Sequence, residues 1–385
     1  MKKLSDYIKT TIDNRGRNPE KYYEKEDYPV IDNYLIKNTL YPDMEAVNRY
    51  IDKKTYDNFL RGYVHKNMPL MTLVGNGIGN VTLAPSNDVA IIQNTIGFEC
   101  NSNTDEIFLY YYLLYRQEFI KKFDRGSGQP SIRKTDLLNM EVCIPDIGEQ
   151  KKIRDVLFCI DKKIEENKKI NNNLFEQAKA LFKNWFVDYE PFSSDNTMPE
   201  NWRMGTVGDI IELHDSKRIP LSGSERDKME KIYPYYGATS LMDYVDNYLF
   251  DGIYLLLGED GTVVDDKGFP ILQYIDGKFW VNNHAHILTG KLGYSVEELY
   301  LLFSLTNIKS IVTGAVQQKV SQTNLKKVPV IIPPVNVLKR FDDIIQPIFA
   351  EIRNLRSENQ RLSSIRDSIL PKLMSGDIDI SEVDI

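Results

Sequence analysis

The feature that most constrains this chain is an internal repeat whose spacing is close to half of its 385 residues. Gly126 and Gln129 return as Gly314 and Gln317, and both pairs are separated by 188 positions (314 − 126 = 188 and 317 − 129 = 188). The same spacing relates matching residues without a gap as far as Leu174, whose equivalent is Leu362 (362 − 174 = 188). An unbroken spacing over such a length is rare by chance, so the sequence predicts two structurally equivalent halves.

A long helix with a coiled-coil pattern follows the repeated motif in each half. Residues suited to a helix–helix contact recur at alternating intervals of four and three, the heptad spacing of a coiled coil. They are Ile153, Leu157, Ile160, Ile164, Asn167, Asn171 and Leu174 in the first helix, and Phe341, Ile345, Ile348, Ile352, Leu355, Asn359 and Leu362 in the second. Two such helices in one chain most simply pack against each other.

Two polar residues interrupt this apolar pattern at equivalent places. Asn171 and Asn359 differ by the repeat spacing (359 − 171 = 188). A buried Asn at such a position can fix the register of a coiled coil at some cost in stability. The alternative is that both side chains face solvent where the contact loosens. Pro347 lies within the second helical pattern, and it predicts a kink or a late start there.

A β-rich segment precedes each helix, and these two segments differ more than the helices do. Residues 4–8 resemble 207–211, but at a spacing of 203 (207 − 4 = 203), so the segments differ in length. Both contain short apolar runs bounded by turn residues, which is typical of strands, and then one helical stretch, at 105–123 and 295–311. We predict an α+β fold with four segments, which are 1–146 (first module), 147–190 (central helix), 191–334 (second module) and 335–385 (C-terminal helix and tail).

Several short motifs occur in a fixed order in the second module, and their closing part recurs in the first. The second module has Trp202, 207–210, 234–239, 257–261, 282–286, Gly314, Gln317, Val320, Leu325 and 331–334; the first has Gln129, Ile132, Leu137, Ile144, Pro145 and 149–153. In this order of motifs, nearly the whole chain resembles the specificity subunits of type I restriction–modification enzymes. The first module departs from the pattern, since 93–97 (QNTIG) stands in place of the His-Ala-His strand. The second lacks Glu-Gln after its Pro-Pro.

The resemblance implies two α/β target-recognition domains, separated by two long helices that pair as an antiparallel coiled coil with pseudo-twofold symmetry. Each domain would read one half of a bipartite target in double-stranded DNA. The helices would dock two DNA adenine methyltransferase subunits, and restriction or translocase subunits are a further possible partner. S-adenosylmethionine, ATP and Mg²⁺ would belong to these partners, so this chain would have no catalytic residue, cofactor or metal.

The charge of the chain supports an alternative. The net charge is −7, whereas a protein that holds DNA alone usually has a basic excess. A two-headed scaffold that joins protein partners without reading DNA would not need such an excess. Basic residues gathered on one face, or phosphate contacts from partner subunits, would reconcile the charge with DNA binding.

Other bulk features restrict where the chain is expected to work. No stretch approaches the ~20 apolar residues of a membrane helix, and residues 1–6 lack the apolar core of a signal peptide. We therefore expect a cytoplasmic protein without membrane contact. Cys100, Cys143 and Cys159 form no CxxC pair, so neither a disulfide framework nor a zinc site is indicated.

Three motifs could indicate an enzyme. Residues 75–79 (GNGIG) resemble a cofactor loop, but a strand and turn follow at 81–86 where such a loop needs a helix. No GxxxxGK[ST] loop for ATP and no Asn-Pro-Pro-Tyr or Asp-Pro-Pro-Tyr stretch for a flipped adenine is present. The acidic residues at 259–260 and 265–266 are typical of an exposed turn, with a magnesium site as the alternative.

Two histidines lie two residues apart on a predicted strand. His284 and His286 would point to one face, and together they could form half of a metal site. No neighbouring carboxylate or cysteine in the sequence completes it. A contact with base edges or phosphates, or a purely structural role, are the remaining interpretations.

DNA contacts are expected from polar and basic side chains in the loops of each module, because these groups read base edges and bind phosphates. The alternative is that these loops are ordinary polar surface and that the Tyr-Gly turn only shapes the fold. The candidates are Arg15, Arg17, Asn76, Arg125, Ser127, Gln129, Arg133 and Lys134 in the first module, and Lys217, Arg218, Tyr235, Tyr236, Thr239, His284, Gln317 and Lys319 in the second.

Overall fold

The computed structural model describes residues 2–195, 197–314 and 316–380, and the chain divides into two compact units. The first unit comprises Met1–Asn167 and Glu358–Ile385, and the second comprises Lys168–Ser357. Each unit thus contains one module together with part of each long helix. The unit boundaries fall inside the helices, whereas the domains inferred from the sequence end where the helices begin. Ala315 of the repeated motif and the last five residues lie outside the described residues.

The two long helices are α5 (Ile147–Phe186) and α10 (Val335–Ser375). Their first residues differ by the repeat spacing (335 − 147 = 188), and each begins directly after the Ile-Pro motif that closes its module. The late start predicted from Pro347 is wrong, because α10 is already helical for twelve residues (335–346) before this proline.

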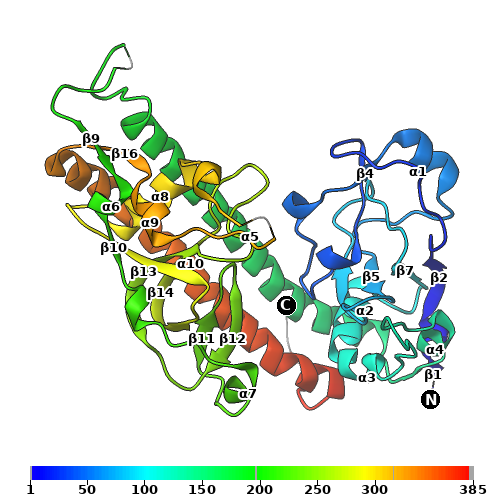
Figure 1. Ribbon diagram of the computed structural model, residues 1–385. Coiled ribbons are helices and arrows are strands. Elements are labelled where there is room, and N and C mark those ends of the chain that lie inside the picture. The colour runs from blue at the N-terminus through cyan, green and yellow to red at the C-terminus, as the bar shows by residue number, and fades with distance from the viewer. Residues whose placement is uncertain (1, 196, 315, 381–385) are drawn as a thin grey trace. The chain divides into compact units, whose positions relative to one another are not determined.

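Within each unit, α5 and α10 lie side by side and run antiparallel (Figure 1). In the first unit, Arg366 donates a hydrogen bond of 2.7 Å to Asp161, and Asn167 donates one of 2.9 Å to Asn359. Residues with higher numbers on α5 therefore contact residues with lower numbers on α10, as expected for antiparallel helices. In the second unit, the ring of Phe341 packs against the aromatic rings at the C-terminal end of α5. The antiparallel pairing is thus present in both units.

The predicted contact residues of the helices are buried to different degrees. Ile153, Leu157, Ile164, Phe341, Ile345 and Ile352 are buried, and Ile160, Leu174, Ile348 and Leu362 are partly buried. The polar residues behave differently from one another. Asn359 contacts Asn167 and the backbone oxygen of Ile164, while the side-chain oxygen of Asn171 is buried without a hydrogen-bond partner. Antiparallel packing explains this, because it places Asn359 opposite Asn167.

The first module is built around a four-stranded antiparallel sheet in the order β2-β7-β5-β6. Helix α2 packs against β5, β6 and β7. The elements of this module are β1 (Lys2–Lys3), η1 (Leu4–Tyr7), β2 (Ile8–Ile12), β3 (Tyr28–Pro29), η2 (Asn33–Leu35), η3 (Met44–Ala46), β4 (Tyr50–Ile51), α1 (Lys53–Phe59), β5 (Pro69–Thr72), β6 (Val81–Leu83), β7 (Thr95–Cys100), α2 (Glu106–Tyr115), α3 (Gln117–Lys121), α4 (Lys134–Leu138) and β8 (Glu141–Val142).

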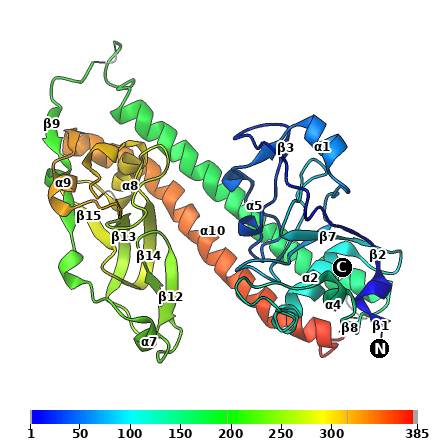
Figure 2. The ribbon, with the colours of Figure 1, turned by 45° about the vertical axis from the view of Figure 1, so that its right-hand side comes forward.

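The second module has a six-stranded sheet in the order β10-β15-β13-β14-β11-β12, in which only the β11–β14 pair is parallel. Helix α8 packs against β13, β14 and β15 (Figure 2). The elements of this module are β9 (Arg203–Thr206), α6 (Val207–Ile210), β10 (Ile211–Leu213), η4 (Asp215–Lys217), α7 (Gly223–Arg226), β11 (Tyr233–Tyr236), β12 (Leu241–Val245), β13 (Phe250–Gly258), β14 (Leu272–Val281), β15 (Ala285–Gly290), α8 (Val296–Leu305), η5 (Lys309–Ile311), α9 (Gln322–Lys326) and β16 (Pro329–Ile332).

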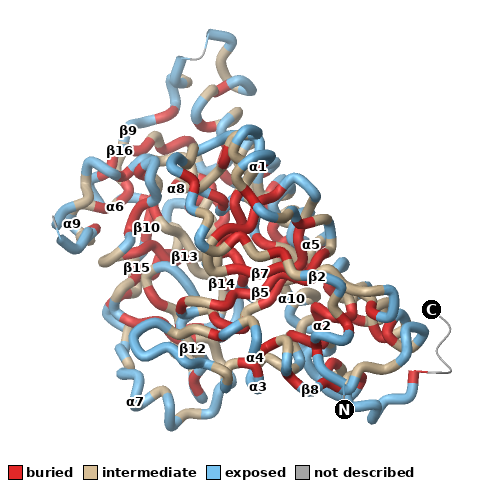
Figure 3. Tube along the Cα trace, turned by 90° about the vertical axis from the view of Figure 1, so that its right-hand side faces the viewer, coloured by how far each residue is buried: buried red, intermediate tan, exposed pale blue. Residues whose placement is uncertain are grey.

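The central strands are arranged in the same order in the two modules. The neighbours β2-β7-β5 of the first module correspond to β10-β15-β13 of the second, and a short strand pair closes each module, β1–β8 and β16–β9. Among these strands, β5, β7 and β15 are largely buried (Figure 3). The apolar cores also include helix residues, among them Leu157 in the first unit and Phe341 in the second. The long helices thus complete the core of both modules.

Candidate nucleic-acid interface

In both modules, the turn that leads into the closing loop requires a glycine. Gly126 and Gly314 are the equivalent glycines of the repeat, and a Cβ atom on either would overlap the backbone oxygen three residues later, at Gln129 or Gln317. Gly314 also has a φ of +90°, which favours glycine over other residues. The tight turn therefore explains why the glycine and its spacing recur, and it presents Gln129 and Gln317 in exposed positions.

Both closing loops attach to the central sheet through equivalent backbone hydrogen bonds. In the first module, the N–H of Ile132 donates to Leu73 O at 2.8 Å. In the second, the N–H of Val320 donates to Glu259 O at the same distance. Each module has a second, neighbouring backbone bond. The N–H of Gly75 donates to Pro130 O in the first module, and the N–H of Gly261 donates to Gln318 O in the second. We refer to residues 128–133 and 316–321 as the first and second closing loops.

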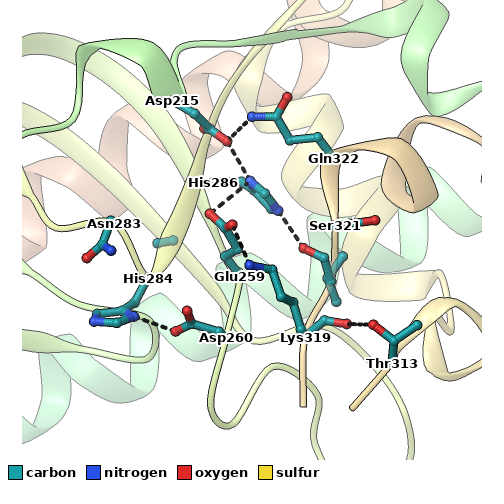
Figure 4. Close-up of polar contacts among 12 residues, drawn as sticks. Asp215, Glu259, Asp260, Asn283, His284, His286, Thr313, Lys319, Ser321 and Gln322 are labelled. Atoms are coloured by element: carbon teal, nitrogen blue, oxygen red, sulfur yellow. Dashed lines mark hydrogen bonds and ion pairs between the residues drawn. The ribbon is translucent and has the colours of Figure 1, made fainter. Parts of the chain in front are cut away.

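Buried charged side chains surround the second closing loop (Figure 4). His286 in β15 is fully buried and bonds Asp215 at 2.6 Å and the backbone oxygen of Val320 at 2.8 Å. Gln322, the first residue of α9, donates to the same Asp215 oxygen at 2.6 Å. Side chains from β15 and α9 therefore converge on the carboxylate of Asp215 in η4.

Glu259, which follows β13, is the second carboxylate of this group. It accepts a hydrogen bond of 2.7 Å from Arg218, and Lys319 of the closing loop lies 3.5 Å from it. Arg218 also lies 3.5 Å from Asp215. Burial alone raises the pKa of Asp215, but the hydrogen bonds from His286 and Ile287 N and the charge of Arg218 lower it overall. We call Asp215, Arg218, Glu259, His286, Lys319 and Gln322 the ionic cluster.

Three members of the ionic cluster could hold a metal ion by distance alone. The ligand atoms of Asp215, Glu259 and His286 lie within 4.8 Å of one another, so the expectation that no carboxylate stands beside these histidines is wrong. The ring geometry disfavours an ion, however. Nε2 of His286 lies 2.8 Å from the backbone oxygen of Val320 and Nδ1 lies 2.6 Å from the Asp215 carboxylate, so a metal ion would have to replace an existing contact of the ring. Arg218 already supplies the balancing positive charge.

The two histidines do not share one face, contrary to the prediction from their spacing. His284 lies in the turn before β15 and pairs with Asp260, away from the partners of His286 (Figure 4). The strand begins only at Ala285, so the two-residue alternation does not extend to His284. The other acidic pair forms a turn, as predicted: Asp265 accepts hydrogen bonds from the backbone N–H groups of Lys267 and Phe269.

The first module has a simpler arrangement at the equivalent place. Asp13 follows β2 and pairs with Arg15 at 2.7 Å and with Lys134 at 3.7 Å. Lys134 begins α4 just as Gln322 begins α9, and the two are one repeat apart (322 − 134 = 188). A carboxylate at the end of the opening strand therefore contacts the start of the closing helix in both modules.

The predicted DNA-contacting residues fall into two groups. Exposed residues are Asn76, Arg125, Ser127, Gln129, Arg133, Lys217, Thr239, Gln317 and Lys319. Partly buried residues are Arg15, Arg17, Lys134, Arg218, Tyr236 and His284. Of the second group, Arg218 is engaged by the ionic cluster and Arg17 lies over the ring of Phe59, 5.5 Å from its centroid. Two of the exposed residues are engaged in ion pairs, because Lys319 lies 3.5 Å from Glu259 and Arg125 lies 2.8 Å from Asp136.

Tyr235 stands apart from both groups. It is 1% exposed, and its hydroxyl accepts a hydrogen bond of 3.0 Å from Leu221 N. The ring lines a small pocket that Asn283 and His284 also border. A direct contact of Tyr235 with DNA would require this ring to leave the core, so the structure favours the interpretation that the Tyr-Gly turn shapes the fold.

The glycine-rich loop at 75–79 is a turn between two strands. It connects β5 with β6, and the N–H of Gly79 donates to Thr72 O. No helix begins there, as the sequence predicts, so the loop lacks the helix N-terminus that a cofactor phosphate needs. Asn76 is exposed at its tip.

The sequence prediction missed the carboxylates Asp13 and Asp215, and it did not connect Glu259 with His286. These residues are far apart in the sequence, and no local motif marks them. A signal was present in the repeat: Lys134 and Gln322 are related by 188 positions, and a carboxylate follows the opening strand of each module. An insertion in β2, visible as a register shift after Ile8, obscured the match between Asp13 and Asp215.

Within the described ranges, no helix combines the length and apolar character that spanning a bilayer requires. A family model described as type I restriction modification DNA specificity domain matches residues 1–176 and again 199–364. The MjaIX type I restriction enzyme specificity subunit of Methanocaldococcus jannaschii is 27% identical over 340 residues, covering 78% of this chain and 77% of the relative. The HindI type I specificity subunit of Haemophilus influenzae is 24% identical over 353 residues, covering 70% and 77%.

A solved structure has a similar fold. The S subunit of a type I restriction-modification system from M. genitalium aligns with a TM-score of 0.51 at 16% identity, covering 97% of this chain and 95% of that one. At this identity the similarity concerns the fold. Both copies of the family model include a module and the helix that follows it, in agreement with the internal repeat.

Proposed function

Because the chain belongs to the family of type I restriction–modification DNA specificity subunits, we propose that it selects the DNA sequence on which its partner subunits act. It is a non-catalytic subunit that recognises DNA. In our proposal each module reads one half of a bipartite target, and the bases between the two halves are not read. The helices α5 and α10 then serve as the spacer between the two half-sites.

The observation that carries this proposal is the shared frame of the two closing loops. The backbone bonds that attach each loop are the same, while the exposed side chains on the loops differ, with Arg133 in one and Lys319 in the other. A constant frame with variable polar side chains suits two modules that bind the same kind of ligand and read different sequences.

The partners follow from membership of the family. Specificity subunits assemble with methyltransferase and restriction subunits in type I systems. We propose two DNA adenine methyltransferase subunits for this chain, one for each half of the repeat. S-adenosylmethionine, ATP and Mg²⁺ would be bound by those partners, and the complex would work in the cytoplasm. The net charge of −7 is compatible with DNA binding if the partners supply part of the phosphate contacts.

The experiment that tests the proposal is an adenine-methylation map. The chain is expressed with a type I DNA adenine methyltransferase partner in a host that lacks other adenine methylation. We expect one bipartite motif with a fixed unread gap, which disappears when this chain is omitted. Exchanging residues 1–146 or 191–334 for the module of a relative should change only one half of the motif.

Two results would contradict the proposal. One is an absence of methylation although both proteins are soluble and associated, and the other is a motif that persists without this chain. Either result would favour a scaffold that joins protein partners without reading DNA. The association of the two proteins, checked by size-exclusion chromatography, is the necessary control.

A further inference from the structure

The strand pairing shows which residues of the two modules are equivalent around the closing loops. Met71 pairs with Ile96 in the first module, and Leu257 pairs with His286 in the second. The spacings are 186 for the inner strand (257 − 71) and 190 for its neighbour (286 − 96). Two residues further along the inner strand, the backbone oxygens of Leu73 and Glu259 accept the equivalent bonds from the loops.

These equivalences reveal a difference in what fills the space beneath the two loops. In the first module the positions are occupied by Leu73 and Ile96, both fully buried and apolar. In the second they are occupied by Glu259 and His286, which carry the ionic cluster. The same backbone frame is thus supported by an apolar contact in one module and by buried charges in the other.

We propose that Asp215, Glu259 and His286 are positioning residues for the second closing loop, so that reading of the second half-site depends on the ionic cluster. This inference rests on the proposed function. His286 holds the loop directly, through the hydrogen bond from Nε2 to Val320 O, and Glu259 restrains Lys319 at 3.5 Å. None of the three carboxylate or imidazole groups needs to touch DNA itself.

The physical reason is that base reading requires precise placement of exposed side chains. A binding residue must be held within about 0.5 Å of its productive position by the residues behind it. Gln317 and Lys319 are exposed and sit on a loop that His286 and Glu259 of the ionic cluster contact, together with the hydroxyl of Thr313, which bonds Lys319 O at 3.2 Å. A hydrogen bond to a charged group is stronger than one between neutral groups, so the second loop is held by directional bonds that apolar packing does not supply.

The equivalent residues of the first module suggest which substitutions to make in the second. The double substitution Glu259→Leu with His286→Ile gives the second module the side chains of the first, and it removes one acidic and one basic group together. Arg218 keeps its bond of 2.7 Å to Ala285 O and its ion pair with Asp215. Replacing both members of a buried ion pair by apolar residues is often tolerated, so this variant is expected to fold.

The complex with a methyltransferase partner is assayed on duplexes that carry single base substitutions in one half-site. In the double variant, discrimination against substitutions in the second half-site should fall about tenfold, as expected for the loss of a charged hydrogen bond. Discrimination in the first half-site should not change. Amide hydrogen exchange in residues 316–321 should become faster by a similar factor. Exposed charges of the same module, replaced in Glu212→Gln with Lys291→Gln, are the matched control and should leave all of these values unchanged.

A second pair of variants covers the case in which the double variant does not fold. Gln322→Leu removes the hydrogen bond to Asp215, whereas Gln322→Lys introduces the residue that contacts Asp13 in the first module. We expect the Leu variant to lose second-half discrimination and the Lys variant to retain it. Equal behaviour of these two variants, or an equal loss in both half-sites, would overturn the positioning role. A wild-type complex without any bipartite motif would instead contradict the proposed function itself.

Discussion

The guanidinium of Arg366 donates a hydrogen bond of 2.7 Å to the carboxylate of Asp161, where α10 packs against α5 in the first unit. The hydroxyl of Tyr111 in α2 donates to the other oxygen of the same carboxylate. Asp161 is 3% exposed. Both helices and the first module thus meet at one buried acidic group.

Removing one partner of this contact should destabilise the first unit strongly. Arg366→Ala leaves Asp161 buried without its positive partner, which costs about 3–5 kcal/mol in comparable cases. We expect the melting temperature to fall by roughly 6–20 °C. The double variant Asp161→Leu with Arg366→Leu should be much closer to wild type, because no unpaired charge remains. Equal destabilisation by the single and the double variant, measured by calorimetry, would show that packing dominates over charge.

Glu298 predicts a pH dependence of stability in the second unit. It is fully buried in α8, and burial raises the pKa of its carboxyl group to about 8. A carboxyl group with a raised pKa in the folded state favours folding while it is protonated, and this contribution is lost as the pH rises toward the folded pKa. Stability should therefore decrease between about pH 5 and pH 9.

The substitution Glu298→Gln tests this prediction. The amide cannot ionise, and its oxygen can still accept the bond from Ser295 N. We expect little change in the free energy of unfolding at pH 5 and a gain on the order of 3–5 kcal/mol at pH 9. Exposed Glu212, changed to Gln, should show no such dependence. A gain of equal size at both pH values would rule out ionisation as the cause.

The glycines that precede the closing loops, Gly126 and Gly314, should not tolerate a side chain. Gly126→Ala and Gly314→Ala would each force the backbone oxygen three residues later to move, so we expect a loss of about 1–3 kcal/mol and faster amide exchange in the loop concerned. Gly128→Ala is the matched control, because its Cβ would meet nothing within 4 Å. Similar effects of the Gly126 and Gly128 substitutions in a chemical denaturation series would contradict the steric explanation.

An exposed basic residue should contribute to DNA binding through phosphate contacts. Lys217 is exposed at the end of η4, and Lys217→Ala should weaken binding similarly on all sequences. The slope of log K against log salt should decrease by about one, measured by fluorescence anisotropy with the assembled complex. Lys217→Arg preserves the charge and should keep the slope. An unchanged slope for Lys217→Ala would place this residue outside the DNA interface.

Much of the architecture was predictable because it depends on periodic patterns. The heptad spacing identified both long helices, and the motif with Gly126 and Gln129 identified the repeat and the closing loops. The same logic failed where a pattern ends, as it did for His284, which lies just before β15 begins. Pro347 also misled the prediction of the helix start, since the surrounding helix is long enough to continue through the missing hydrogen bond.

The candidate site was less predictable, for a physical reason. Asp215, Glu259 and His286 come from three segments, and only the pairing of β13 with β15 and the fold of the closing loop bring them together. Burial then decides their role, because charges that would be solvated on a surface must find partners inside the module. The predicted contacts of Arg218 and Tyr235 with DNA are disfavoured by the same effect.

The sequence by itself determined that this chain has two equivalent halves, that a long heptad helix follows each module, and where the turn residues of both closing loops lie. These properties are encoded in local spacing, which the backbone geometry of helices and tight turns converts directly into structure. Only the tertiary structure decided that Asn359 faces Asn167, and that one loop rests on Leu73 and Ile96. It also decided that the other loop rests on buried charges. Such contacts join residues distant in sequence, and no local pattern specifies them.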